Sequence, residues 1–416
     1  MLGCGNIGSA VCRLIQEQKD FFEKEKGVCI SINRVLVRSL DKKRDCDLPR
    51  EVYTTRPEEV LNADDIDVVM EFLGGEQPAA EYICTALLNG KNVITANKLA
   101  LATHWNEIQA ARRNGKAQLL YEASVCGAIP VIHVLRTGCQ ANPLRSVMGI
   151  INGTTNYILS RMSDEGCTYD EALKAAQKLG YAEPDPTMDV EGLDAVYKLS
   201  ILSTLAFRRH LPAESIYHEG ITAIQPLDLQ MGKEFGLTLK LLAIAKAGED
   251  GVECRVHPTL IPDGHPLASV KGAFNAVLVD GTSSGEMMFY GKGAGDMPTA
   301  SALVSDLIKL TDHAGEDDCL LMEKGTVVED WTSRFFVRMR VPDRTGILSM
   351  VSGVFARHGV SIAQMVQRQI PGDEEGAMMI FLTHLAREKA TMKALRELAD
   401  FTSDIHVIRV ENHDEA

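Results

Sequence analysis

The stretch Leu193–Phe207 constrains the fold most, because it is apolar or uncharged except for Asp194 and Lys198. A helix that is apolar on every side is usually buried. Residues four apart face the same way, so the carboxylate and the ammonium lie together. Burial lowers a lysine pKa and raises that of an aspartate, while mutual attraction opposes both shifts. The pair is either a structural ion pair or a site where the lysine exchanges protons with a substrate near neutral pH.

The size and composition of the chain are those of a soluble globular protein with two or three domains. It has 416 residues, of which 45% are hydrophobic and 24% charged, and its formal net charge is −14. This charge argues against nucleic-acid binding and favours small-molecule partners. Without a membrane-length apolar run or a leader, we expect no membrane partner and a cytoplasmic location. The 10 cysteines form no CxxC pair, which fits neither a zinc site nor a redox dithiol.

A glycine-rich segment at residues 3–8, GCGNIG, matches the dinucleotide-binding pattern GxGxxG and continues into the helical sequence AVCRLIQEQ. Such glycines allow a tight turn and a close backbone approach, so that a pyrophosphate can sit on the helix N-terminus. By itself the pattern has low specificity. The residues expected to contact the cofactor are Gly3, Gly5, Asn6, Ile7 and Gly8.

The strand that should precede this glycine loop is missing, because only Met1 and Leu2 stand before it. That strand is central in a doubly wound sheet, so its loss is expected to expose hydrogen-bonding groups on both neighbouring strands. We interpret the numbering as starting at an internal methionine, or the chain as truncated. A chain that truly began here would have a compromised cofactor site.

The expected second strand, residues 30–37, ends in Arg38, with Lys42 and Lys43 close behind. A carboxylate at this strand end would bind the ribose 2′-hydroxyl of NAD, whereas an arginine with nearby lysines suits the 2′-phosphate of NADP. The alternative is that Arg38 only ends a strand in solvent. The basic cluster favours NADP(H) over NAD(H).

Three more strands, at residues 67–73, 92–96 and 119–121, complete the expected parallel sheet. Binding sites in such sheets lie at the carboxyl ends of strands, which makes Lys98 a candidate site residue. Glu122 follows the last strand and precedes several small residues that could present carbonyls to a monovalent cation. A plain strand-to-helix turn explains that loop equally well.

The succession of parallel strands ends before residue 146. A strand at 146–151 then leads through a turn with Thr154 into a helix. A threonine at a helix start usually caps it, but its hydroxyl could also meet a small polar substrate. A second, amphipathic helix ends on Gly180. Glu183 and Asp189 then flank two prolines ahead of the buried helix, so four charged groups gather around its start.

Further strands are expected at 251–260, 275–280 and 286–290, followed by a cluster that includes Gly293 and by a helix at 299–311. The glycine cluster suits a second backbone approach to a cofactor, and the helix could return to the first domain. After an acidic linker, six elements follow in the order β-α-β-β-α-β, which is a ferredoxin-like unit. This unit carries no nucleophile, cofactor loop or metal cluster and suits a regulatory or pairing role.

These blocks together closely resemble homoserine dehydrogenase in its form with a C-terminal ACT domain. The resemblance spans nearly the whole chain, apart from the first strand. It rests on GCGNIG, TANK at 95–98, NGTTNYIL at 152–159, YAEPDPTMDVEGLDAVYKLSIL at 181–202 and GKGAGDMPTASA at 291–302. The long block around Lys198 is the most specific of them.

The fold class implied is α/β, with a Rossmann-type dinucleotide-binding domain whose first strand is truncated, an α+β catalytic and dimerisation domain, and a ferredoxin-like ACT domain. We expect the first domain at residues 1–125 with a return helix at 296–314. The catalytic domain is expected at 126–295, the linker at 315–331 and the ACT domain at 332–416. A homo-oligomer, dimer or tetramer, is also expected.

The activity implied is NAD(P)-dependent interconversion of L-aspartate 4-semialdehyde and L-homoserine, towards threonine, methionine and isoleucine. By position in the family's motifs, Lys198 donates the proton to the carbonyl oxygen. Glu183 and Asp194 hold the amino group and polar end of the substrate, with Asp189 close by and Thr154 lining the pocket.

The resemblance also implies several binding residues. Lys98 lies near cofactor and substrate, and Gly180 and Gly293 give backbone contacts to the cofactor. The structural sodium site consists of Glu122, Val125, Gly127 and Ile129. The ACT signature DxxGxL consists of Asp343, Gly346 and Leu348, with threonine as the expected effector; the alternative is that the ACT domain only dimerises. Two other functions stay open: another NAD(P)-dependent oxidoreductase of a small amino or hydroxy acid, and an inactive amino-acid sensor.

Overall fold

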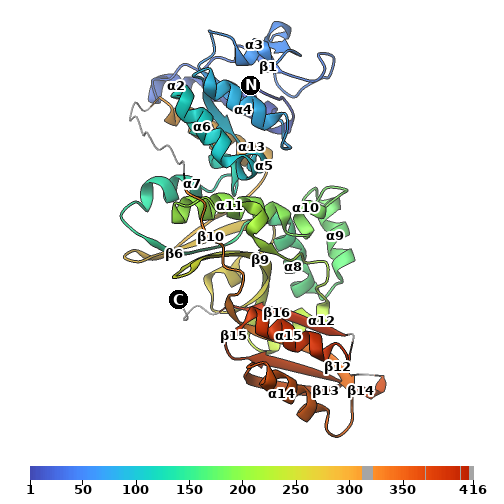
Figure 1. The fold of residues 1–416 in the computed structure, drawn as a ribbon. Coiled ribbons are helices and arrows are strands. Elements are labelled where there is room, and N and C mark those ends of the chain that lie inside the picture. Colours follow the sequence, from blue (N-terminus) through green and yellow to red (C-terminus); the bar gives the residue numbers. More distant parts are fainter. Residues whose placement is uncertain (312–321, 371, 403, 412–416) are drawn as a thin grey trace.

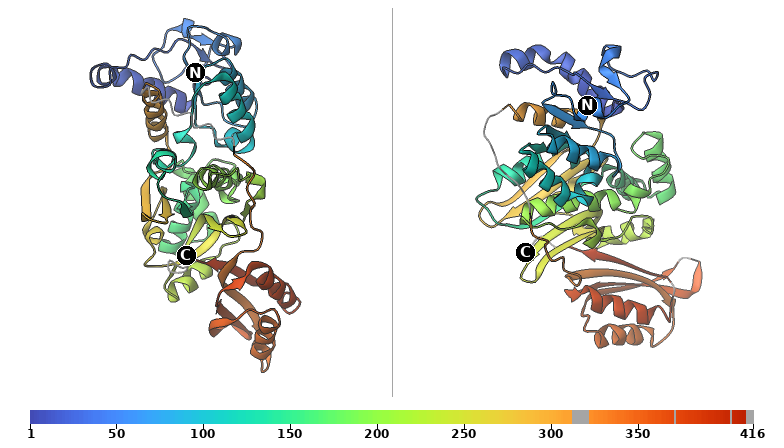
Figure 2. Two further views of the ribbon diagram at one scale, coloured as in Figure 1. Left: turned by 60° about the vertical axis from the view of Figure 1, so that its left-hand side comes forward. Right: turned by 45° about the horizontal axis from the view of Figure 1, so that its top comes forward.

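The computed structural model describes residues 1–311, 322–370, 372–402 and 404–411. The chain forms three tiers, with the N-terminal domain at the top of Figure 1, a sheet-and-helix domain in the middle and the C-terminal domain at the bottom. Helix α13 (Asp296–Lys309) returns to the top tier and packs against α1 (Asn6–Glu17), as both views in Figure 2 show. The predicted three-part α/β fold is confirmed. The exact domain boundaries stay predictions.

The N-terminal domain is built on a parallel sheet in which Leu2 occupies the central position between two strands. Helices α1 and α13 cover one face of this sheet, and α4 (Ala79–Leu88) and α6 (Trp105–Gly115) cover the other. In sheet order the members are β2 (Tyr53–Thr54), β1 (Val35–Leu36), Leu2, β3 (Val68–Glu71), β4 (Asn92–Thr95) and β5 (Leu119–Leu120).

The expectation that both neighbours of the first strand expose their hydrogen-bonding groups is wrong around Leu2. The Leu2 amide donates to the Met70 carbonyl at 2.7 Å, and the Phe72 amide donates to Leu2 at 2.9 Å. On the other side the Leu36 amide donates to Met1 at 2.9 Å. The buried Leu2 therefore satisfies the hydrogen-bonding groups of both neighbouring strands at the start of the glycine loop. The predicted strand at 30–37 shortens to β1, because the residues before it find no strand partner among the described residues.

The middle domain is an antiparallel sheet covered on one side by α8 (Gly153–Glu165) and α11 (Leu193–Phe207). Helix α11 has the predicted bounds. Strand β8, which with β9 is one of the two longest strands of this sheet, was not predicted, because its middle is buried on both faces and lacks the polar alternation that marks a strand. The strands in sheet order are β11 (Gly285–Lys292), β10 (Phe274–Gly281), β6 (Leu144–Ile150), β8 (Leu237–Gly248) and β9 (Gly251–Pro262).

The C-terminal domain has the predicted β-α-β-β-α-β order, with a two-residue strand β15 (Ala386–Arg387) added. Its main elements are β12 (Thr332–Pro342), α14 (Ile347–Arg357), β13 (Ile362–Ile370), β14 (Asp373–Thr383), α15 (Glu388–Leu398) and β16 (Ile405–Val410). Strand β16 pairs in parallel with β9, so the two domains share one 11-stranded sheet. This continuity was not predicted from the sequence.

Buried ion pairs reinforce the junction between these two domains. The Arg338 guanidinium lies 2.7 Å from Asp228, and both side chains are at most 2% exposed. Arg409, on β16, donates to the partly exposed Glu219 of the middle domain at 2.5 Å. Part of the predicted linker, residues 315–321, lies outside the described residues; the described part runs alongside the middle domain through a bridge between Val327 and Val252. The two domains thus form one packed unit.

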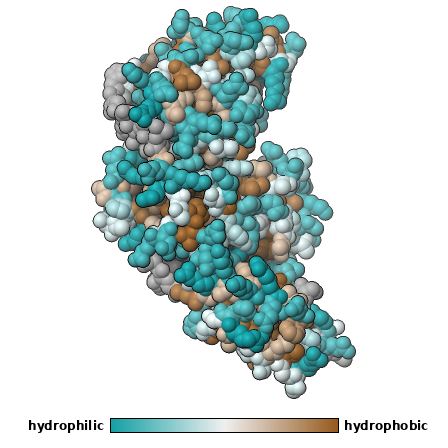
Figure 3. Space-filling view, viewed as in Figure 1, coloured by the Kyte–Doolittle hydropathy of each residue, from teal (hydrophilic) through white to brown (hydrophobic). Residues whose placement is uncertain are grey.

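The surface seen in Figure 3 is mostly hydrophilic, with apolar side chains scattered among the polar ones on the middle tier. Within the described residues, every helix is too short or too polar to cross a bilayer.

Candidate active site

The candidate site lies where the N-terminal domain meets α11. Helix α5 (Lys98–Thr103) begins directly after β4, at the carboxyl edge of the parallel sheet, and packs on α11 (Figure 1). Asn97 caps α5 by accepting a hydrogen bond from the Ala100 amide at 3.0 Å. Its amide group donates to the Gly75 carbonyl at 2.8 Å. This cap fixes Lys98 at the helix start, facing the first turn of α11.

A single carboxylate joins the two elements. Asp194 Oδ1 lies 2.7 Å from Lys98 Nζ, and Asp194 Oδ2 lies 2.7 Å from Lys198 Nζ. Lys198 Nζ also donates to the Ile151 carbonyl at 2.9 Å. The exposed fraction of the side chain is 6% for Asp194, 12% for Lys198 and 38% for Lys98. Only Lys98 therefore faces substantial solvent.

The attraction within this triple outweighs the effect of burial. Burial would raise the pKa of Asp194, but the ammonium groups of Lys198 and Lys98 hold that pKa well below its usual range. Burial would likewise lower the pKa of Lys198, but the Asp194 carboxylate raises it. In this geometry the Asp194 carboxylate favours the ammonium form of Lys198, and the exchange of its proton with a substrate stays a prediction.

Asn152 is a further site residue, and the sequence-based list of site residues did not include it. Its amide group donates to Asp189 at 2.7 Å and to Asp194 at 2.8 Å. Its side-chain oxygen accepts from the Thr155 amide at 2.9 Å and so caps α8. The signal was available, since asparagine before a threonine pair at a strand-to-helix turn is a strong helix cap. Burial and the charge of Asp194 raise the pKa of Asp189.

The structure places the other predicted substrate residues around this centre at different depths. The Thr154 hydroxyl donates to the Tyr181 carbonyl at 2.6 Å and so holds the turn that follows Gly180. Asp189 lies on α10 (Thr187–Val190) and joins the centre through Asn152. Glu183 is exposed, and its carboxylate forms no hydrogen bond or ion pair with the described residues. The geometry therefore brings Asp189 into the network and leaves Glu183 at its rim.

The glycine loop has the shape that a pyrophosphate needs. Gly3 has φ +103°, a conformation that side chains disfavour. A methyl group on Gly8 would lie 2.8 Å from the Gly3 carbonyl oxygen. Gly5 forms the N-cap of α1, with Asn6 and Ile7 in its first turn, and open space lies beside it. The helix N-terminus is thus accessible to an anion, and the residues fit a dinucleotide.

Arg38 lies in solvent two residues beyond β1. The Gly3 amide donates to the Leu36 carbonyl at 3.0 Å, so the end of β1 is tied to the glycine loop. The arginine therefore extends from the sheet edge at which a cofactor ribose would lie.

The predicted cation loop is buried and has spare acceptors. Among the described residues, no backbone amide donates to the carbonyls of Val125 and Gly127. The Glu122 carboxylate accepts the Ile132 and His133 amides at 2.8 Å each. Burial raises its pKa to about 7, with the charge of Asp306 adding to the effect.

The same loop contacts the second glycine cluster. A methyl group on Gly127 would lie 2.8 Å from the Gly293 carbonyl oxygen, and one on Gly293 would collide with Asn275. Both glycines are therefore required by packing. Ile129 accepts the Val131 amide at 2.8 Å and also packs against Gly291. These carbonyls and the buried negative charge fit a monovalent cation.

Comparisons with known proteins agree with this geometry. The model "Homoserine dehydrogenase" matches residues 130–308, "Homoserine dehydrogenase, NAD binding domain" matches 3–122, and "ACT domain" matches 335–400. A homoserine dehydrogenase of Bacillus subtilis is 40% identical over 96% of this chain and 94% of its own length. The chain belongs to the homoserine dehydrogenase family.

Solved structures of homoserine dehydrogenases share the fold. One from Thiobacillus denitrificans superposes with a TM-score of 0.91 at 38% identity and covers 99% of this chain and 97% of its own. A hyperthermophilic archaeal homoserine dehydrogenase in complex with NADPH has a TM-score of 0.63 at 26% identity and covers 74% of this chain and 96% of its own.

The ACT signature of this chain forms the turn between β12 and α14 and the first turn of α14. The Asp343 carboxylate accepts from the Gln367 side chain at 3.1 Å, and the Asp343 amide donates to Glu375 at 2.9 Å. Gly346 has φ +91° and starts α14, and Leu348 is exposed in the first turn. The turn is thus preorganised and partly open to a ligand.

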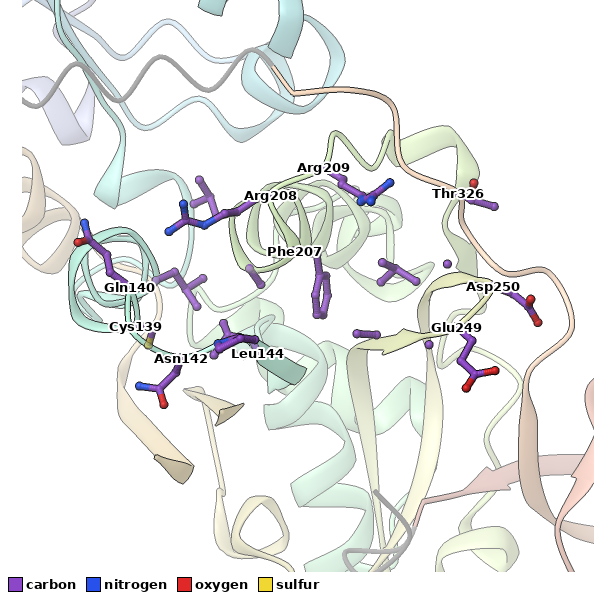
Figure 4. A pocket seen from close by; sticks show the side chains of 18 residues that line it. Cys139, Gln140, Asn142, Leu144, Phe207, Arg208, Arg209, Glu249, Asp250 and Thr326 are labelled. Atoms are coloured by element: carbon purple, nitrogen blue, oxygen red, sulfur yellow. The ribbon is translucent and has the colours of Figure 1, made fainter. Parts of the chain in front are cut away.

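A separate cavity of about 570 Å³ lies at the other end of α11, beside Phe207, Arg208 and Glu249 (Figure 4). The 15-residue helix is roughly 20 Å long, so this cavity is remote from Asp194. None of the predicted site residues lines it.

We expect Asp194→Asn to lower the pKa of Lys198, because burial then acts without the opposing carboxylate. In the pH profile of kcat/KM, the alkaline limb should move at least one unit towards neutral pH. Asp189→Asn serves as the control, since it neutralises a neighbouring carboxylate without removing the partner of Lys198. An alkaline limb that stays in place in Asp194→Asn would show that Lys198 does not control it.

Proposed function

We propose that this chain catalyses the NAD(P)-dependent interconversion of L-aspartate 4-semialdehyde and L-homoserine, within cytoplasmic threonine, methionine and isoleucine biosynthesis. The observation that carries the proposal is the Lys98–Asp194–Lys198 triple at the junction between the dinucleotide-binding and catalytic domains. The cofactor supplies or accepts the hydride when bound. The chain itself must hold an amino acid and manage one proton.

Lys198 is the proposed proton donor to the carbonyl oxygen of the semialdehyde. An ammonium has three N–H donors. Two of those on Lys198 bond to Asp194 and Ile151, which leaves one for a substrate oxygen. The raised pKa keeps the group protonated before reduction, and the two anchors fix its position. General acid catalysis of this kind contributes about 10²- to 10⁴-fold.

The charges around Lys198 suit a substrate with an ammonium and a carboxylate. Lys98 uses one N–H on Asp194 and is the most exposed member of the triple, so it can bind a carboxylate. Asp194, Asp189 and Glu183 supply negative charge for the ammonium, with Asp189 held by Asn152. We propose that Thr154 lines the pocket by fixing the turn at Tyr181.

Lys198→Ala should lower kcat by two to four orders of magnitude while the Kd for NADPH stays within threefold of that of the parent chain. Steady-state kinetics with aspartate semialdehyde and fluorescence titration with NADPH measure the two quantities. Lys178→Ala, an exposed lysine at the end of α9 (Tyr169–Lys178), serves as the control. Retention of half the activity in Lys198→Ala would remove this lysine from the proposed role.

NADP(H) is the proposed preferred cofactor, with Gly3, Gly5 and Gly8 shaping the pyrophosphate loop. Support comes from exposed Arg38 beyond β1 and from the related archaeal enzyme in complex with NADPH. Gly180, at a turn with φ +77°, and Gly293 are the proposed further backbone contacts.

Arg38→Ala should raise KM for NADPH at least tenfold and change KM for NADH less than twofold, because only NADPH carries the 2′-phosphate. Arg50→Ala is the matched control, since Arg50 is an exposed arginine further along the same segment. Equal changes in KM for NADPH and NADH would contradict a contact between Arg38 and the 2′-phosphate.

A structural sodium ion is proposed at Glu122, Val125, Gly127 and Ile129. The buried carboxylate and the two carbonyls without backbone donors support it. Such an ion would brace the catalytic domain against the dinucleotide-binding domain without taking part in the chemistry. Equal melting temperatures in sodium chloride and in choline chloride at the same ionic strength would contradict it.

Threonine is the proposed effector of the ACT domain. Its site would include the turn with Asp343, Gly346 and Leu348, where one carboxylate is available for an ammonium. The shared sheet and the Arg338–Asp228 pair give that domain a rigid connection to the catalytic domain. The alternative role is subunit pairing alone.

Asp343→Ala should raise the threonine concentration for half inhibition at least tenfold, because the carboxylate that faces the effector ammonium is lost. Inhibition curves at fixed substrate measure this, with Asp400→Ala at the end of α15 as the control. A chain that threonine never inhibits, or an unchanged curve in Asp343→Ala, would remove the sensor from this turn.

A homo-oligomer is proposed through the middle domain. Strand β11 is an edge strand whose exposed face carries Met288 and Tyr290, with Tyr290 stacked on Phe274 at 5.1 Å. Met288 and Tyr290 share this face with the charged Glu286 and Lys292, and such an apolar patch with a polar rim suits a second copy of the chain. Light scattering that gives the mass of one chain at micromolar concentration would contradict it.

The inactive-sensor alternative rests on the missing first strand. Against it, Leu2 pairs with Leu36 and Glu71 on its two sides, so the start of the glycine loop stays within the sheet. The alternative of another small-molecule oxidoreductase is tested by comparing aspartate semialdehyde with generic aldehydes.

A further inference from the structure

Three cysteines that are far apart in the sequence meet beside the glycine loop. Cys4 lies within the loop, Cys12 lies on α1, and Cys46 lies in the segment between β1 and β2. Their sulfur atoms all lie within 4.8 Å of one another. Cys4 Sγ and Cys46 Sγ are 3.6 Å apart, which is van der Waals contact for two sulfur atoms. Neither of these two side chains is fully buried.

The segment that carries Cys46 is held in place by α1 from both sides of the cysteine. Arg13 forms an ion pair with Asp45, and the Gln16 side chain donates to the Asp47 carbonyl at 2.6 Å. Cys46 Sγ also contacts the Tyr53 hydroxyl at 3.3 Å. The approach of Cys46 to Cys4 is therefore set by surrounding contacts.

We propose that Cys4 and Cys46 are an oxidation site, in which peroxide converts the two thiols into a disulfide that closes the dinucleotide-binding loop. The Cys4 thiolate attacks hydrogen peroxide to give a sulfenic acid and hydroxide. The Cys46 sulfur then attacks the Cys4 sulfur, the S–O bond breaks, and the oxygen leaves as water with the Cys46 proton. Two thiols are oxidised and one peroxide is reduced.

The surroundings of Cys4 favour the first step. The neighbouring thiol of Cys12, together with Ser9 and Cys46, lowers the pKa of Cys4 to about 6, so its thiolate predominates at neutral pH. Burial raises the pKa of Cys46, which suits a resolving thiol better than an attacking one. Cys12 is buried, and its Sγ contacts Met1 Sδ at 3.9 Å, so it is the less accessible partner.

The expected consequence is weaker cofactor binding. A disulfide needs its sulfur atoms about 2.05 Å apart, so Cys4 and Cys46 must draw together by roughly 1.5 Å. Cys4 stands between Gly3 and Gly5, and its movement displaces the backbone that would carry the pyrophosphate. The disulfide would also join the segment between β1 and β2, which includes Arg38, to the glycine loop. This consequence rests on the dinucleotide binding proposed above, whereas formation of the disulfide does not.

Peptide mass spectrometry after treatment of the full chain with hydrogen peroxide tests the site directly. We expect a Cys4–Cys46 cross-link that dithiothreitol reverses, and we expect saturating NADPH to slow its formation at least fivefold. Fluorescence titration should give a Kd for NADPH at least tenfold higher in the oxidised chain. Cys46→Ser should keep the Kd unchanged after peroxide, and Cys29→Ser, which removes an exposed cysteine elsewhere, should behave like the parent chain.

The outcomes separate the two proposals. A cross-link without any loss of NADPH binding would overturn the proposal that the disulfide closes the dinucleotide-binding loop. No cross-link, or one between Cys4 and Cys12, overturns the oxidation site even if the reduced chain converts aspartate semialdehyde normally. A cross-link that weakens NADPH binding in a chain inactive towards aspartate semialdehyde supports the oxidation site and contradicts the proposed substrate instead.

Discussion

The buried carboxylate of Asp194 is the interaction on which the rest of the structure depends. A carboxylate this far from water is costly unless cations and hydrogen-bond donors surround it. Here one ammonium comes from its own helix and the other comes from the start of α5 in a different domain. The charge requirement of one side chain therefore fixes how the dinucleotide-binding domain meets the catalytic domain.

A buried ion pair also holds the ACT domain in place. Arg338 is almost wholly buried and depends on Asp228, a residue of the middle domain. Removing one partner of such a pair leaves an uncompensated charge, which costs about 3–5 kcal/mol. Together with the β16–β9 pairing, this makes the two domains one continuous sheet. A ligand that moves β12 would act on the strands beneath α11 without crossing a flexible linker.

The parts of the fold that were predictable from the sequence are those with a local signature. Helix α11 was delimited correctly because its sequence is apolar or uncharged except for Asp194 and Lys198, and two arginines follow its last residue. The ACT elements were found in order because their strands and helices alternate with polar turns. Strand β8 was missed because burial on both faces removes the polar alternation that marks a strand.

The sequence by itself determined that Asp194 and Lys198 share one face of a buried helix, because helical periodicity is local. Only the tertiary structure decided that Lys98 and Asn152 complete the group, that Leu2 pairs with both neighbouring strands, and that Cys4 contacts Cys46. These contacts join residues far apart along the chain, and their formation depends on how whole elements pack. The direction in which the pKa of Lys198 shifts also depended on the tertiary structure. Burial and the attraction of Asp194 oppose each other, and only the distances between the groups decide which effect is larger.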